Sequence, residues 1–115
     1  MARIGPDSAD GGQFPIVGGF GAPMEATSEI QELADQVKNR VQVVTGKNME
    51  HYQVMQFRSQ IVSGTIYLIK VLIGPKDECV HIKVFVSLST KKEETQLLGM
   101  EPGKKLSDPL IPFQG

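Results

Sequence analysis

The chain has 115 residues, of which 40% are hydrophobic and 22% charged, a composition typical of one globular domain with one core. A formal net charge of -1 and the absence of an apolar stretch of about 20 residues argue against nucleic acid or a membrane as partner. The N-terminus lacks an apolar signal segment, and Cys79 is the single cysteine, so we expect a cytoplasmic protein without internal disulfides. Export by an unconventional route stays open.

The first 27 residues are rich in Gly, Pro, Asp and Ala and show neither helical nor strand periodicity. We assign residues 1–17 to a flexible N-terminal arm and residues 18–115 to a single domain. The arm contains one short apolar patch, residues 14–17, which is unusual for a purely solvated tail.

The pattern changes to helical at Ser28, which we expect to be the N-cap of a capping box with Gln31. Gly46 is a typical C-terminal stop. The sequence therefore predicts one long α-helix that is buried on one side. Its apolar stripe repeats at helical spacing and consists of Ile30, Leu33, Ala34, Val37, Val41 and Val44.

Strand patterns follow over residues 52–63, 65–73, 80–88 and 96–100. The third alternates cleanly, with Val80, Ile82 and Val84 on one face and His81 and Lys83 on the other. We expect residues 101–115 to form an extended surface segment. Sequential strands with short connections predict an α+β fold, in which an antiparallel meander packs its apolar face on the helix.

Enzymatic and metal chemistry find little support in the residues. Cys79 and His81 share one side of a strand, but without flanking cleft elements we interpret them as a surface pair rather than a catalytic pair. One cysteine and two separated histidines give no metal-ligand spacing. The glycines at 18, 19 and 21 follow no strand and lack the lysine of a phosphate loop. We therefore expect no catalytic residue, metal or cofactor.

Residues 60–64 read Gln60-Ile61-Val62-Ser63-Gly64 and are followed by a strand pattern at 65–71. This hairpin, with that strand, resembles the Gln-x-Val-x-Gly hairpin of the type 1 cystatins, or stefins, and the stretch 81–88 looks like the strand that feeds the second loop of that family. Residues 42–46 fit the same five-residue pattern. We choose the later copy because the earlier one continues the helical stripe, and because only the later one leads into the stefin-like strand.

The resemblance implies a cystatin fold, an antiparallel five-stranded sheet wrapped around one long α-helix. It also implies a reversible, tight-binding, competitive inhibitor of papain-like cysteine proteases, the cathepsins L, S, B and H among them, which inserts a wedge into the active-site cleft. The active form would be a monomer, with a domain-swapped dimer as a second form. The protease-binding residues implied are Val17, Gly18, Gly19, Gln60, Ile61, Val62, Ser63, Gly64, Leu88, Ser89 and Thr90.

Two alternatives stay open. The chain departs from the usual stefin pattern at Ser89, where proline is usual, and this favours a non-inhibitory stefin-like interaction protein as the second interpretation. A small enzyme on a cystatin-like fold is the third, because one fold can carry different functions. Such an enzyme needs acid–base groups that point into the interior, whereas the helical stripe is entirely aliphatic.

Overall fold

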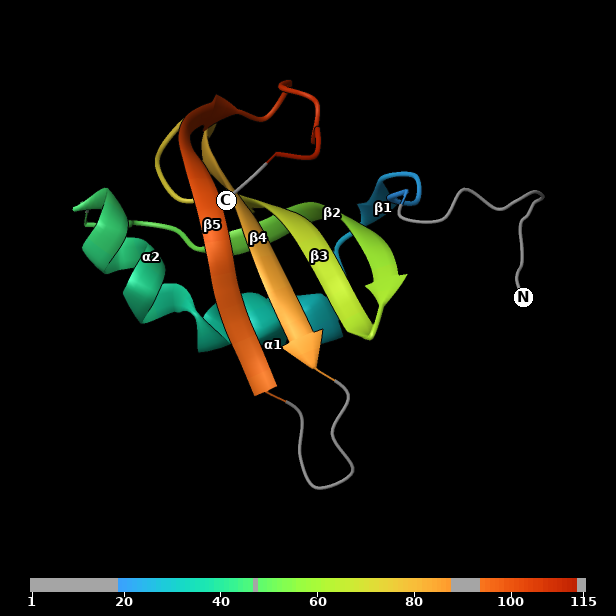
Figure 1. Ribbon diagram of the computed structural model, residues 1–115. Helices are drawn as coiled ribbons and strands as arrows, with labels where there is room; N and C mark the ends of the chain where they lie inside the picture. Colours follow the sequence, from blue (N-terminus) through green and yellow to red (C-terminus); the bar gives the residue numbers. More distant parts are fainter. Residues whose placement is uncertain (1–18, 47, 88–93, 114–115) are drawn as a thin grey trace.

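A five-stranded antiparallel sheet organises the chain, and its strand order, β1-β2-β3-β4-β5, follows the sequence (Figure 1). The computed structural model describes residues 19–46, 48–87 and 94–113. Two helices lie across one face of the sheet, so the predicted α+β fold is confirmed. The strands are β1 (Met24–Glu25), β2 (Gln53–Val62), β3 (Gly64–Leu72), β4 (Glu78–Ser87) and β5 (Glu94–Lys105).

The helical segment begins one residue earlier than the sequence suggests. Thr27 is the N-cap of α1 (Ser28–Gln36), and its side-chain oxygen accepts a hydrogen bond from the Ile30 amide at 3.2 Å. The capping box predicted for Ser28 and Gln31 is therefore wrong. Gln31 instead joins the helix to β2, because its side chain accepts from the Val54 amide at 2.8 Å and donates to the Tyr52 carbonyl at 3.1 Å.

The long helix expected from the sequence is interrupted at Val37, and a second helix, α2 (Lys38–Thr45), follows. Val37 leaves helical angles, with φ -105° and ψ 7°, and its amide bonds to the Ala34 carbonyl three residues back. Such a three-residue bond tightens the turn and changes the direction of the axis. The side chain of Val37 stays buried while the helix turns, and Val44, expected in the stripe, is 66% exposed.

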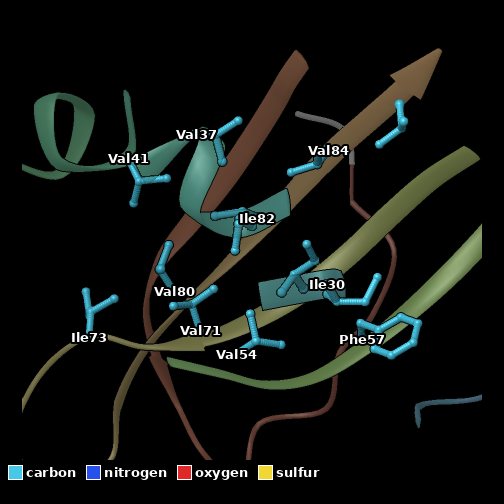
Figure 2. Close-up of a cluster of buried hydrophobic side chains, with 13 residues drawn as sticks. Ile30, Val37, Val41, Val54, Phe57, Val71, Ile73, Val80, Ile82 and Val84 are labelled. Atoms are coloured by element: carbon cyan, nitrogen blue, oxygen red, sulfur yellow. The ribbon is translucent and has the colours of Figure 1, made fainter. Parts of the chain in front are cut away.

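The main core lies between the helices and the sheet (Figure 2). The clean alternation predicted for β4 is confirmed on this side, because Val80, Ile82, Val84 and Val86 are all buried there. Aliphatic side chains fill the space between the two layers, and Phe57 is the buried aromatic among them. The other buried members are Ile30, Ala34, Val37, Val41, Val54, Ile69, Val71 and Ile73.

Part of the opposite, outer face of the sheet is covered by the C-terminal segment, residues 106–113, which turns back after β5 at one end of the sheet (Figure 1). Buried Lys70 on β3 donates from Nζ to the carbonyls of Leu106, at 2.6 Å, and of Asp108. Lys83 on β4 donates to the Phe113 carbonyl at 2.9 Å. The side chain of Leu110 is only 2% exposed. Lysine side chains thus fasten the segment by its main chain.

This cover changes two expectations. Cys79 and His81 are 0% and 1% exposed, so their interpretation as a surface pair is wrong. Leu68, on the same outer face of the sheet, is also fully buried. Residues 101–105, expected in a surface segment, extend β5, and Glu101 pairs with His81 across the ladder. The burial of Cys79, His81 and Leu68 on this face is therefore a tertiary effect, which depends on the C-terminal segment.

Candidate functional site

The β2–β3 hairpin ends in the sharpest reversal of the sheet. Its ladder continues as far as the pair Val62↔Gly64, which leaves Ser63 alone at the apex. Ile61 is 82% exposed and Val62 is 44% exposed. Gln60 is partly buried and interacts with another residue. Exposed branched aliphatic side chains at the tip of a well-paired hairpin form a small apolar surface that is held rigidly by the backbone ladder.

Gly64 is required by the fold at this point. Its φ of +132° is disfavoured for residues that carry a Cβ. A Cβ would also lie 2.5 Å from the Val86 carbonyl oxygen and 2.9 Å from the Phe85 ring. The absent side chain therefore lets β3 pack closely against β4 directly below the apex. The positive φ and the close contact with β4 are therefore two separate reasons for glycine at this position.

The end of β4 lies beside this apex, because Ser87 is the ladder partner of Gly64. The polypeptide that continues from Ser87 thus starts next to the hairpin. Leu88, Ser89 and Thr90 are among the protease-binding residues that the resemblance implies. They lie outside the described residues. The register places only Ser87, the last described residue before them, at the same edge of the sheet as the hairpin.

The N-terminal segment approaches the same edge along β2. Met24 of β1 pairs with Phe57, and the Gly21 amide donates to the Ser59 carbonyl at 2.9 Å. With decreasing residue number the chain therefore runs along β2 toward the hairpin. Gly19 is exposed. Val17 and Gly18 lie outside the described residues, so of the expected N-terminal contacts only Gly19 is placed.

The buried Cys79 and His81 do not form an activated nucleophile. Burial raises the pKa of the Cys79 thiol. Burial, with Lys70 and Lys104 nearby, lowers the pKa of His81 to about 4. Both groups are therefore neutral near pH 7, and His81 Nε2 has no hydrogen-bond partner among the described residues. A catalytic cysteine needs the reverse, a stabilised thiolate that substrate can reach.

The part of the chain that the structure describes gives little support for metal binding or for a catalytic pocket. There, no three His, Cys, Asp or Glu side chains gather as a metal site would require. An open pocket of about 210 Å³ lies against α1, and its carboxylates, Glu29 and Glu32, are exposed to water. Neither described helix has the length and apolarity needed to cross a bilayer.

The second copy of the hairpin pattern, residues 42–46, is a helix terminus. Gln42 and Thr45 belong to α2, and Gly46 is its left-handed C-cap, with φ 67° and an amide that donates to the Gln42 carbonyl at 2.9 Å. The choice of residues 60–64 as the hairpin copy is confirmed.

A helical layer on a five-stranded antiparallel meander, with an exposed apolar hairpin at one edge, is the architecture of the cystatin class. The chain belongs to the cystatin family, because residues 18–107 match the family described as Cystatin domain. It is 40% identical over 98 residues to "Leukocyte cysteine proteinase inhibitor 1" of Sus scrofa, covering 85% of this chain and 94% of that protein. "Stefin-C" of Bos taurus is 39% identical, with 86% and 97% covered, and "Cystatin-A" of Homo sapiens is 37% identical, with 85% and 99% covered. The resemblance to type 1 cystatins is confirmed.

Proposed function

We propose that this protein is a reversible, tight-binding, competitive inhibitor of papain-like cysteine proteases, including cathepsins of the L, S, B and H types, and that it is not an enzyme. The observation that carries the proposal is the hairpin apex, where Ile61 and Val62 are exposed on a rigid ladder. The relative named "Leukocyte cysteine proteinase inhibitor 1", of which 94% is covered, supports the same proposal.

In this proposal the hairpin, the segment after β4 and the N-terminal arm enter the cleft of the protease together. Ile61 and Val62 supply apolar contact, with Gln60 and Ser63 at the flanks and Gly64 keeping the hairpin close to β4. Leu88, Ser89 and Thr90 bind on one side, and Val17, Gly18 and Gly19 on the other. Central, well-desolvated apolar contacts carry most of the affinity of such interfaces.

The rigidity of the sheet explains why binding would be tight and reversible. A hairpin that is already ordered loses little conformational entropy on docking. Cleavage requires a peptide carbonyl at attack distance from the enzyme thiolate, and a hairpin held by its own ladder does not bring one there. The inhibitor would therefore occupy the cleft without becoming a substrate.

Titration of papain with the purified protein tests the proposal, with Ile61→Ser as the informative variant. We expect inhibition by the wild type and a roughly tenfold to hundredfold weaker inhibition constant for Ile61→Ser. The free energy gained by burying one Ile side chain corresponds to a change in affinity of about this size. Val43 on α2 is also exposed, at 79%, so Val43→Ser is the matched control and should inhibit like the wild type. Folded protein without inhibition at micromolar concentration would instead favour the non-inhibitory interaction protein.

We further propose that the monomer is the active form. Opening of the hairpin apex would let the helices and β2 exchange with a second copy, and the resulting dimer would lose the apex. Heating followed by size-exclusion chromatography, with a papain assay on each fraction, tests this under reducing conditions that keep Cys79 from cross-linking. A dimer that inhibits as well as the monomer, per chain, would contradict the mechanism.

A further inference from the structure

One arginine joins three parts of the chain on the outer face of the sheet. Arg58 of β2 donates from Nε to the Gly21 carbonyl at 2.7 Å and from Nη2 to the Phe20 carbonyl at 3.4 Å. Its Nη1 donates to the Leu110 carbonyl at 2.8 Å. The guanidinium therefore holds residues 20 and 21, which follow the N-terminal arm, and the C-terminal segment at the same time.

The guanidinium group is suited to this task. It stays charged at all relevant pH values, and its donors are fixed in a planar fork, so several carbonyls can be bound at a defined angle. Hydrogen bonds from a charged donor are shorter and stronger than those between neutral groups. A lysine at this position would keep the charge, but a single ammonium cannot reproduce the fork.

The N-terminal segment has few other attachments. Every residue from 21 to 29 is exposed, so this stretch is not held by buried side chains. β1 is only two residues long, and its pairing with β2 is extended by the single bond from the Gly21 amide to the Ser59 carbonyl. Arg58 lies next to Ser59, so its two bonds to the carbonyls of Phe20 and Gly21 add directly to this weak attachment.

We infer that Arg58 is a positioning residue, which fixes the direction in which the N-terminal arm leaves the sheet beside the hairpin. The inference rests on the proposed function, since it concerns delivery of the arm to the same protease cleft. Arg58 is on the strand that leads to the apex, so the arm and the hairpin are aligned by one rigid element. The bond to Leu110 makes the C-terminal segment part of the same support.

Loss of the guanidinium fork should weaken inhibition through the position of the arm, because Arg58 is not one of the proposed protease-binding residues. Arg58→Lys leaves the arm to be ordered during docking, and fixing the backbone of about one residue corresponds to a roughly fivefold to thirtyfold weaker inhibition constant for papain. Lys83→Gln is the matched control, because Lys83 fastens the C-terminal segment through Phe113 and not the arm. We expect Lys83→Gln to remain within about twofold of the wild type.

A double-mutant cycle with Val17→Ser separates positioning of the arm from any effect on the hairpin. Positioning predicts that Arg58→Lys has less than about a twofold effect once Val17, the proposed arm contact, has been replaced. Equal losses in both backgrounds would overturn the inference, and so would a Val17→Ser variant that inhibits like the wild type. Failure of the wild type itself to inhibit would refute the proposed function instead.

A measurement on the unbound protein tests the fork without relying on protease inhibition. The Gly21 amide should be protected from hydrogen exchange, because it is bonded to the Ser59 carbonyl while the Gly21 carbonyl accepts from Arg58. Protection at Gly21 should fall in Arg58→Lys while the amides of β3 and β4 keep theirs. Exchange of the wild-type Gly21 amide at the rate of an unfolded chain would show that the fork does not hold the arm, and would overturn the inference.

Discussion

Acidification should destabilise this protein through His81. The imidazole is buried between β3 and β5, and the charged groups around it are Lys70, Lys104, Glu101 and Asp108. Burial, followed by the two lysines, lowers its pKa from 6.5 to about 4. The unfolded chain therefore binds this proton more strongly than the folded one. Stability is fully present above about pH 6.5 and falls as the pH drops toward 4, and the full difference corresponds to about 3 kcal/mol.

Urea unfolding at a series of pH values from 7.5 to 4 measures this loss. Carboxylates contribute to the same curve, so the quantity that isolates His81 is the difference in unfolding free energy between the wild type and His81→Gln. We expect that difference to change by up to about 3 kcal/mol across the range, in favour of the variant at low pH. His51 is exposed, and His51→Gln should follow the wild-type curve at every pH.

The neighbouring lysine gives an independent check. Lys70 lowers the pKa of His81, so Lys70→Met should raise that pKa, which a histidine proton NMR titration reads directly. Parallel unfolding curves for the wild type and His81→Gln between pH 7.5 and 4 would refute the argument, because they would show that His81 accepts its proton equally well in the folded chain.

Five further substitutions test the packing of the sheet and the cap of the helix. Gly64→Ala should cost about 2–4 kcal/mol in urea unfolding, because strain at positive φ adds to the clash with β4, whereas Gly103→Ala, at φ 74° with nothing within 4 Å, should cost about 1 kcal/mol. Equal losses would remove the argument from close packing. Thr27→Ala should lower the stability by about 1 kcal/mol and Ser28→Ala by a few tenths, and the reverse order would restore Ser28 as the N-cap. Leu110→Ala should cost about 2–3 kcal/mol, and no loss in thermal unfolding would show that the outer face does not need its cover.

The side of the sheet that faces the helices could be predicted, because alternation encodes it directly. Val80, Ile82 and Val84 repeat every second residue, and their burial follows from that period. The outer face could not be predicted in this way. Its cover has no periodicity, and it is held by main-chain carbonyls that accept from Lys70 and Arg58. Main-chain acceptors are the same at every residue, so the sequence does not reveal which of them a lysine or arginine will bind.

In the helix and the hairpin, too, some features could be predicted from the sequence and others depend on tertiary contacts. The stripe predicts the helical face, but the interruption at Val37 is a main-chain feature, the bond from its amide to the Ala34 carbonyl, which the stripe does not encode. The β1 strand, with two residues, is too short to produce a pattern. At the site, the motif predicts which residues reach the apex, including the choice between residues 42–46 and 60–64. The role of Arg58 is not visible in the sequence, because it arises from contacts with residues 20, 21 and 110.

The position of the C-terminal segment in the chain has a consequence for biosynthesis. Each strand pairs with the strand that follows it, so the ladder can form in the order in which the ribosome delivers it. Residues 106–113 are made only after all five strands. Until they emerge, Leu68 and the Cys79 thiol are without their cover, on a sheet that is otherwise complete. A nascent or shortened chain would thus present apolar surface and a reactive thiol to chaperones and oxidants, which the finished protein hides.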